Sequence, residues 1–267
     1  MSAWRQAVES YRDRRVLTVL VLGFSSGLPL LLTYSTLSAW LAKEGISRSA
    51  IGLFALVGLP YALKFLWSPL IDRLPPPLPL GRRRGWAVAI QLALMAAILT
   101  LGALDPKQQI GAMAAVAVVV AFLSASQDIV IDAYRIELLD EAHQGPGAGA
   151  VQVGYRLAML VAGAGTLFLA QAFGWFVGYA VMACLMVVGI VVLLISPEPA
   201  VDNTVLRAKH GGLSGELYQT IIRPFADLMQ RSGWPAVLIF IVTYKLGEAM
   251  AGVMATPLYI SLGFSLV

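Results

Sequence analysis

Apolar blocks, each close to twenty residues long, follow one another along the sequence and are separated by short polar segments. A helix needs roughly 20 predominantly apolar residues to cross the hydrocarbon core of a bilayer. Charged residues make up only 13% of the 267 residues, against about 25% in an average soluble domain. These features predict an all-α polytopic membrane protein and exclude an ordinary soluble domain.

Seven blocks qualify as membrane spans, and their predicted ranges are 16–41, 50–71, 86–104, 110–134, 148–172, 175–195 and 234–262. The segment between the sixth and seventh spans is polar and rich in proline and glycine, which is typical of a linker with a short interfacial helix near 213–230. We therefore expect a six-helix transmembrane bundle over 1–196, a cytoplasmic linker over 197–233, and the first helix of a second bundle over 234–267.

A weak internal repeat also favours a second bundle. The end of the first span, residues 38–47, and the end of the seventh, residues 256–265, share their Gly and Ser positions with one apolar residue between them. If the seventh span repeats the first, the sequence is the first half of a longer protein with two six-helix halves. Chance similarity over ten residues is the alternative.

Lys and Arg residues are distributed unevenly over the polar segments. With the N-terminus inside, 13 of the 19 fall on inside segments, 3 on outside segments and 3 within spans. Basic residues accumulate in the cytoplasmic segments of membrane proteins, so we expect a cytoplasmic N-terminus. The pI of about 9.3 has the same origin and does not indicate a nucleic-acid partner.

Two carboxylates, Asp128 and Asp132, follow a long apolar run in the fourth span. A four-residue spacing puts them on one helix face, and acids inside a membrane are costly unless that face meets protein or water. A medium of low dielectric favours the neutral form of a carboxyl group, so their functional interpretation is proton coupling. The alternative is a pair of interfacial charges near the cytoplasmic end of the span.

Two of the three basic residues within predicted spans are candidates for binding an anionic substrate. Arg156 lies in the fifth span near the depth of Asp128, where it would pair with that acid or clamp a substrate carboxylate or phosphate. Lys64, in the second span, would face a cavity and bind an anion. The alternatives are a purely structural ion pair for Arg156 and a side chain that extends to the membrane interface for Lys64.

Uncharged and aromatic groups extend the predicted substrate site, and tyrosine rings are suited to stacking on sugar faces. The further candidates for substrate contacts are Gln127, Tyr34, Tyr61, Tyr155 and Glu248. Glu248 lies three residues from Lys245 in the seventh span, where the two side chains would pair locally or line a cavity.

The first span carries Gly23, Gly27 and Pro29 within seven residues. Glycine and proline this close together predict a kink or an unwound turn, which membrane helices tolerate where the freed backbone groups line a cavity. A face of small residues for close helix packing is the alternative.

The sequence contains no catalytic constellation. Both histidines, His143 and His210, fall in polar segments, and neither a metal-ligand spacing nor a phosphate-binding glycine loop occurs. We therefore expect no enzymatic activity, no cofactor and no metal site.

The segment between the second and third spans joins an aspartate to a run of arginines: Asp72, Arg73, Arg82, Arg83 and Arg84. It resembles the loop signature of the major facilitator superfamily. The resemblance implies that these residues form a gate, which latches the cytoplasmic side shut when the transporter opens outward.

Four strings, over 22–29, 64–73, 81–86 and 124–133, together resemble the AmpG-type muropeptide permeases, in the peptide/acetyl-CoA transporter group of that superfamily. The resemblance implies proton-driven import of anhydromuropeptides across the bacterial inner membrane, which serves peptidoglycan recycling and β-lactamase induction. The implied partners are a muropeptide substrate, protons, the lipid bilayer and a missing C-terminal half.

Three other functions stay open from the sequence. The first is a carrier of the same fold for another solute, such as a sugar, a drug or an acyl-CoA. The second is a membrane enzyme acting on lipid-linked sugars, which would need catalytic acids or a metal site at an interface. The third is a non-transporting membrane sensor.

Overall fold

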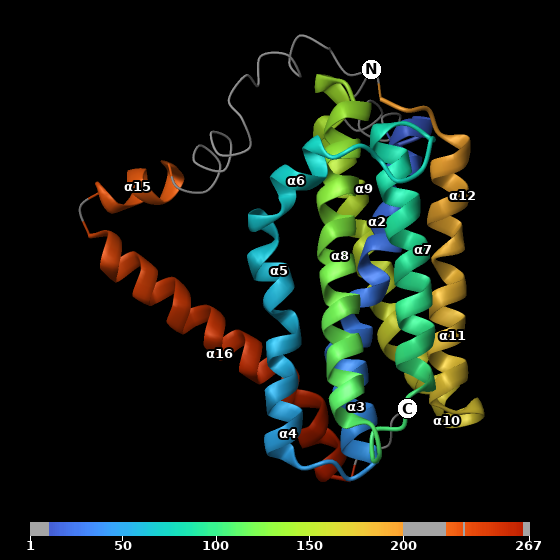
Figure 1. The fold of residues 1–267 in the computed structure, drawn as a ribbon, viewed down its shortest axis with the longest axis vertical. Helices are drawn as coiled ribbons and strands as arrows, with labels where there is room; N and C mark the ends of the chain where they lie inside the picture. Colours follow the sequence, from blue (N-terminus) through green and yellow to red (C-terminus); the bar gives the residue numbers. More distant parts are fainter. Residues whose placement is uncertain (1–10, 200–222, 232, 264–267) are drawn as a thin grey trace, which may run out of the picture.

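The computed structural model describes residues 11–199, 223–231 and 233–263, and every regular element in this part of the chain is a helix (Figure 1). Seven helices within it are long and apolar enough to cross a membrane. The predicted all-α polytopic fold is therefore confirmed.

The first span consists of α2 (Arg14–Thr33) and α3 (Ser35–Lys43), and the third and fourth are α7 (Arg82–Ala103) and α8 (Ile110–Leu138). The fifth consists of α9 (Glu141–Leu160), the π-helical turn η3 (Val161–Gly165) and α10 (Thr166–Phe173), and the sixth of α11 (Trp175–Leu185) and α12 (Val187–Ile195). The fifth span begins at Glu141 rather than at 148, because Asp140 caps its N-terminus by accepting a hydrogen bond from the backbone N–H of His143.

The second span is the least regular. It consists of α4 (Arg48–Leu53), the 3₁₀ segment η1 (Phe54–Gly58), α5 (Leu59–Leu63), the 3₁₀ segment η2 (Lys64–Leu66) and α6 (Ser68–Arg73). Pro60 and Pro69 lack the backbone N–H that a continuous α-helix would use, which accounts for breaks near both positions.

Two ends of the bundle are distinguished below. The α6 end holds α6 and the last turn of α12, and it is the upper end in Figure 1. The α4 end, at the opposite side, holds α4 and α10. The first span runs through the middle of the bundle, and it makes its most extensive contact with α9.

Gly23 and Gly27 serve close helix packing, and the unwound turn that their spacing with Pro29 predicts does not form. The helix α2 continues through Pro29 to Thr33. A Cβ at Gly23 would lie 2.5 Å from the carbonyl oxygen of Val151, and one at Gly27 would lie 2.6 Å from that of Tyr155. The glycines therefore allow the backbones of α2 and α9 to touch, as small residues do in other membrane helix pairs.

The first span breaks instead at Tyr34, where φ is −110° and ψ is −102°. Side chains form hydrogen bonds to backbone carbonyl groups around this break. The Tyr179 hydroxyl donates to the carbonyl of Leu32 at 2.9 Å, and Thr36 Oγ1 donates at 3.1 Å to the carbonyl of Ala162 in the π-helical turn. Irregular turns in the first and fifth spans are thus held by side chains of adjacent spans, as a low-dielectric surrounding requires.

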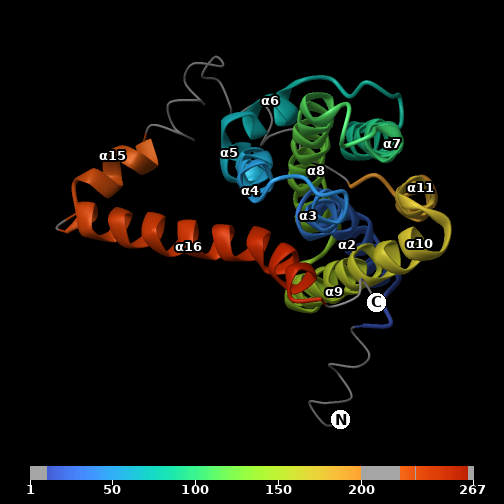
Figure 2. The same ribbon diagram turned by 90° about the horizontal axis from the view of Figure 1, so that it is seen from below.

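The seventh span, α16 (Trp234–Ser261), stands away from the six-helix bundle and follows the short helix α15 (Arg223–Met229) (Figure 2). It contacts α3, α4 and η1 at the α4 end, and most of its described side chains are exposed. Of the interfacial helix predicted over 213–230, the described part contains only α15; residues 213–222 lie outside the described residues.

Candidate functional site

A network of charged side chains closes the α6 end, where the second, third and fourth spans meet. The guanidinium of Arg83, a residue only 6% exposed, lies between two carboxylates. Its Nη1 is 2.6 Å from Asp72 Oδ1 and its Nη2 is 2.7 Å from Glu137 Oε1. Arg82 Nη2 also lies 2.7 Å from Glu137 Oε1. Buried charges are stable only when they are paired, so the network ties α6, α7 and α8 together.

The next arginine of the run has different partners. Arg84 Nε donates to the carbonyl of Leu193 at 2.7 Å and Nη2 donates to that of Leu194 at 2.9 Å. These carbonyls belong to the last turn of α12, which has no further helical N–H to bond them. The arginine run therefore divides into two that pair with acids and one that caps a helix. The side chain of Arg73 lies outside the described residues.

Glu198, just beyond α12, caps α7 in return. Its carboxylate accepts hydrogen bonds from the backbone N–H of Arg83 at 2.7 Å and of Arg84 at 3.1 Å. Gly81 precedes the helix with φ of 99°, and a Cβ there would lie 2.5 Å from Glu198 Cδ. Glycine is therefore the residue that fits this position. Because an acid at a helix N-terminus also interacts favourably with the helix dipole, the third and sixth spans stabilise each other's ends.

Deeper in the bundle, Asp128 is half-buried on α8. Its carboxylate accepts a hydrogen bond from the Ser26 hydroxyl on α2, and Lys64 of η2 lies within electrostatic range. Asp132, one helical turn along, is exposed and also lies within electrostatic range of Asp128. The two predicted acids therefore differ: within the described part of the chain, a hydrogen bond from another span reaches Asp128 and none reaches Asp132.

Three predicted tyrosines lie around this acid. Tyr61 of α5 and Tyr155 of α9 are within electrostatic range of the Asp128 carboxylate. The ring centroid of Tyr34, at the break in the first span, lies 6.3 Å from that of Tyr61, with the ring planes at 44°. The structure thus brings together the set Asp128, Ser26, Lys64, Tyr34, Tyr61 and Tyr155, which we call the Asp128 cluster.

Gln127 lies apart from this cluster in the structure, and its predicted contact with substrate stays a prediction. Its side chain is fully buried, and its Nε2 donates a long hydrogen bond of 3.5 Å to Ser25 Oγ, which also accepts one of 3.0 Å from Gln91 Nε2. Successive residues of an α-helix point about 100° apart, so the helix that presents Asp128 to the cluster turns Gln127 into the contact between α2, α7 and α8.

Arg156 does not form the expected ion pair with Asp128. Within the part of the chain that the structure describes, Arg156 is exposed and its Nη1 lies 3.9 Å from Met159 Sδ. Its neighbour Tyr155 faces the Asp128 cluster, so the same turn of about 100° per residue directs Arg156 away from the acid.

The seventh span adds little to the described site. Lys245 Nζ lies 5.7 Å from the ring centroid of Tyr244. The side chain of Glu248 lies outside the described residues, so its predicted contact with Lys245 or with substrate stays a prediction.

A second ionic cluster joins the starts of α2 and α9 at the α6 end, and its two acids, Asp13 and Asp140, precede these helices. Arg15 Nη2 lies 3.0 Å from Asp13 Oδ2 and 3.1 Å from Asp140 Oδ2, and His143 Nδ1 lies 2.5 Å from Asp140 Oδ1. Hydrogen bonds from Arg15 hold the pKa of Asp13 below its usual value. Hydrogen bonds from His143 and then from Arg15 lower the pKa of Asp140. Both acids therefore stay ionised and hold the two helices together.

Among the described residues, no group of three or more His, Cys, Asp or Glu side chains is arranged to hold a metal ion. The chemistry available to the site is hydrogen bonding, ion pairing, proton binding and aromatic stacking.

Comparison with known proteins matches residues 16–267 to the model of the Major Facilitator Superfamily. The chain is 44% identical over 256 residues to the anhydromuropeptide permease of Escherichia coli strain K12, covering 96% of this chain and 50% of that protein. It is also 32% identical over 260 residues to the putative transporter AmpG 4 of Rickettsia conorii, covering 96% of this chain and 62% of that protein.

A protein of Haemophilus influenzae that carries no functional name is 36% identical over 256 residues, which cover 94% of this chain and 58% of that protein. The chain therefore spans between half and two thirds of the length of these relatives. The matched region, residues 16–267, contains the six-helix bundle, the charged network at the α6 end and the Asp128 cluster.

Proposed function

The chain belongs to the major facilitator superfamily, and we propose that it forms the N-terminal half of a transporter that imports anhydromuropeptides by proton symport. Its relatives with functional names are permeases and transporters, so the chain is part of a transporter and not an enzyme. The proposed location is the bacterial inner membrane, with the N-terminus and the α6 end in the cytoplasm.

The observation that carries the proposal is the Asp128 cluster. A carboxylate, an amine, a hydroxyl and three aromatic rings from four different spans meet inside the bundle. Such groups are costly in a membrane and are kept for function. A transported solute with carboxylates, amides and sugar rings needs this combination of partners.

Asp128 is the proposed proton carrier. The Ser26 hydroxyl donates to its carboxylate, so the ionised form has a partner, and the half-buried position makes the neutral form accessible as well. Lys64 supplies a cation that attracts the carboxylate when the proton has left. Asp132 is exposed one turn away and is proposed as the site that passes the proton on.

Lys64 and Arg156 are the proposed anion-binding groups, and Tyr34, Tyr61 and Tyr155 the proposed sugar-stacking groups. Because the Arg156 guanidinium makes no ion pair within the described residues, it is available to form a bidentate contact with a substrate carboxylate. Glu248 is proposed to complete the site from the seventh span.

The charged network at the α6 end is the proposed cytoplasmic gate. It was predicted from Asp72, Arg73 and Arg82–Arg84, and Glu137 and Glu198 are added here because they bind Arg83. The seventh span contacts the bundle at the α4 end, on the other side of the Asp128 cluster. Contacts at the two ends that form in turn would give alternating access.

Uptake measurements test the substrate assignment. A full-length protein that carries this chain is reconstituted in liposomes, and a tritiated N-acetylglucosaminyl-anhydromuramyl tripeptide is supplied with an inward proton gradient. We expect accumulation that collapses with a protonophore and that unlabelled anhydromuropeptides inhibit. Inhibition by free sugars or acyl-CoA, with none by anhydromuropeptides, would instead identify a carrier of another solute.

A further inference from the structure

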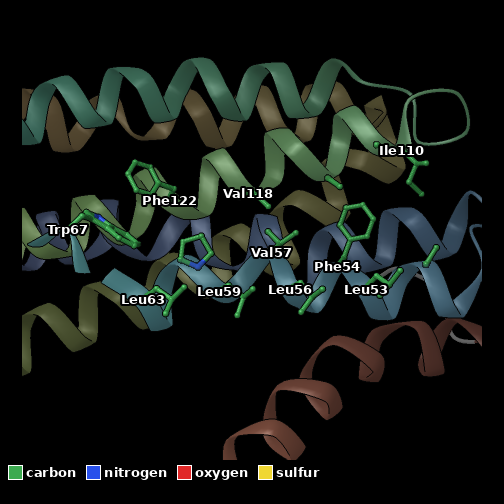
Figure 3. Close-up of a pocket in the computed structure, with 14 residues that line it drawn as sticks. Leu53, Phe54, Leu56, Val57, Leu59, Leu63, Trp67, Ile110, Val118 and Phe122 are labelled. Carbon is green, nitrogen blue, oxygen red and sulfur yellow. The ribbon is translucent and has the colours of Figure 1, made fainter. Parts of the chain in front are cut away.

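His143 is an ionisable group that neither the Asp128 cluster nor the charged network around Arg83 contains. It lies in the first turn of α9 at the α6 end, next to the start of α2. The groove between the second span and α8, by contrast, is lined only by apolar and aromatic side chains such as Leu59 and Phe122 (Figure 3). Among the described residues, His143 carries the only imidazole, the side chain whose charge ordinarily changes between about pH 5 and 8.

Both nitrogens of the His143 ring lie at ion-pair distance from a carboxylate. Nδ1 is 2.5 Å from Asp140 Oδ1, and Nε2 is 3.7 Å from Asp13 Oδ2. A neutral imidazole has one N–H and one lone pair, so it can donate to only one of the two acids. Its lone pair then faces the other carboxylate, which has only acceptors to offer. The imidazolium has an N–H on each nitrogen and can donate to both acids.

The charges of this group are unbalanced when the ring is neutral. Asp13 and Asp140 supply two negative charges, since hydrogen bonds hold the pKa of each acid below its usual value. Arg15 lies 3.0 Å from Asp13 and 3.1 Å from Asp140 and supplies one positive charge. A proton on His143 makes the four charges sum to zero. The N-terminus of α9 disfavours a cation at this position, while the two carboxylates attract it.

No other charged side chain in the described part of the chain pairs with these four groups. The remaining charges at the starts of α2 and α9 and at the end of α8 are Arg12, Arg14, Glu141, Arg135 and Glu137. Glu137 pairs with Arg82 and Arg83, and the other four form no ion pair within the described residues. The charge of the group therefore depends on the protonation of His143.

A small hydrophobic cluster lies beside the four charged groups and belongs to the same contact between α2 and α9. Its buried members are Val16, Val19, Leu139 and Ala150. Further along the same two helices, Ser26 and Tyr155 take part in the Asp128 cluster. The charged groups thus close the α6 end of the helix pair that carries part of the proposed site.

We propose that His143 forms a pH-dependent ionic lock between the first and fifth spans: its imidazolium binds Asp13 and Asp140 together, and loss of the proton releases Asp13. The lock therefore tightens as the pH at the α6 end falls. That end is proposed to face the cytoplasm, where proton-coupled import lowers the pH. The compartment that the lock responds to rests on the proposed function, whereas the lock itself does not.

Hydrogen exchange at the start of α9 tests the lock in the full-length protein, held in lipid nanodiscs at about pH 8 and about pH 5.5. His143→Asn keeps an N–H donor near Asp140 but cannot gain a charge. We expect the amides of residues 145–151 to exchange about fivefold faster in the variant than in the unchanged protein at the lower pH. At the higher pH, the two proteins are expected to exchange at the same rate within about twofold. Comparison at equal pH removes the intrinsic pH dependence of exchange.

The partner acid has its own variant. Asp13→Asn keeps a side-chain cap for α2 but removes the charge that faces Nε2. We expect it to abolish the same pH-dependent gain in protection, so that the double variant with His143→Asn shows no larger effect of pH than either single variant. Glu141→Gln changes an exposed acid of the same turn that has no ion pair in the described part of the chain. It is expected to keep the gain of the unchanged protein.

If a substitution prevents folding, the unchanged protein still gives a test. Between about pH 8 and about pH 5.5, exchange at the start of α9, corrected for intrinsic rates, is expected to slow about fivefold relative to the start of α7, where the cap is Glu198. Equal ratios of the His143→Asn and unchanged rates at both pH values, or no relative slowing in the unchanged protein, overturn the proposal. These measurements involve no transport, so their failure leaves the symport assignment intact, and a failure of symport leaves the lock intact.

Discussion

The Glu198 carboxylate accepts a hydrogen bond from the backbone N–H of Arg83 at 2.7 Å, while the side chain of Arg83 lies between Asp72 and Glu137. One residue therefore connects the segment that follows the sixth span to the charged network of the second, third and fourth spans. A change in that network is therefore expected to alter the position of the segment that leads to the second half.

Removing the Glu198 cap tests this connection. Glu198→Gln keeps the size of the side chain but removes its charge from the N-terminus of α7, and it is expected to lower the free energy of unfolding by about 1 kcal/mol. Thermal unfolding in detergent measures this change in stability. The control is Glu141→Gln, an exposed acid in the first turn of α9, which is expected to change stability less. Equal effects of the two substitutions would mean that the hydrogen bonds of Glu198 contribute nothing beyond its charge.

Glu137→Gln tests the buried network itself. The substitution leaves the nearly buried Arg83 with one acid and Arg82 with none at ion-pair distance within the described residues. We expect the free energy of unfolding to fall by about 2–3 kcal/mol. This value is at the lower end of the cost of breaking a buried ion pair, because Glu137 is partly exposed. Glu44→Gln, which removes the surface pair with Lys107, is expected to cost less than about 1 kcal/mol. A Glu137→Gln protein as stable as the Glu44→Gln protein would contradict the account.

Glu137 and Glu198 show what could not be predicted from the sequence alone. The run Arg82–Arg84 predicts a charged gate, but nothing in its spacing identifies Glu137 or Glu198 as partners, because both are brought to it by the packing of other spans. One signal exists in retrospect: α7 begins after Gly81, which has no side chain to cap the helix, so a side chain from elsewhere could supply the cap.

The limits of the sixth span, by contrast, follow directly from the pattern of apolar residues. The sixth span has the predicted limits, Trp175 and Ile195, because apolar length alone decides them. The partners of Gln127 and Arg156 could not be derived in the same way, since they depend on the rotation of α8 and α9 about their axes. That rotation is set by contacts such as Gly154 against Leu20, which join residues far apart in the sequence.

Gly154→Ala tests the contact between α2 and α9. A Cβ at Gly154 would overlap the carbonyl oxygen of Leu20, so the two backbones must separate, and we expect a loss of about 1–3 kcal/mol in unfolding free energy. Gly145, on the same helix, has open space around it. Gly145→Ala is expected to be neutral or to stabilise by up to about 1 kcal/mol. Thermal unfolding of the two variants side by side gives the comparison, and a Gly154→Ala protein of unchanged stability would refute the close packing.

The ionic cluster of Asp13 and Asp140 predicts a pH dependence of stability. The pKa of each acid is lower in the folded protein than in the unfolded chain, so the folded state binds fewer protons. Their contribution is present above the unfolded pKa of about 3.9 and is lost as the pH falls below it. The stability difference between the unchanged protein and Asp140→Asn is therefore expected to shrink as the pH is lowered from 6 toward about 3. A difference that grows on acidification would show that the sign is wrong.

Asp128 provides the most direct test, through uptake of radiolabelled anhydromuropeptide by full-length protein in liposomes. Asp128→Asn keeps the shape of the side chain and an acceptor for Ser26, but it cannot bind and release a proton. We predict that uphill accumulation driven by a pH gradient falls to the level of empty liposomes, while exchange of labelled for unlabelled substrate continues. Asp105→Asn, in an exposed loop, is predicted to accumulate substrate normally. Undiminished gradient-driven accumulation by the Asp128→Asn protein would contradict the proposed role of this carboxylate.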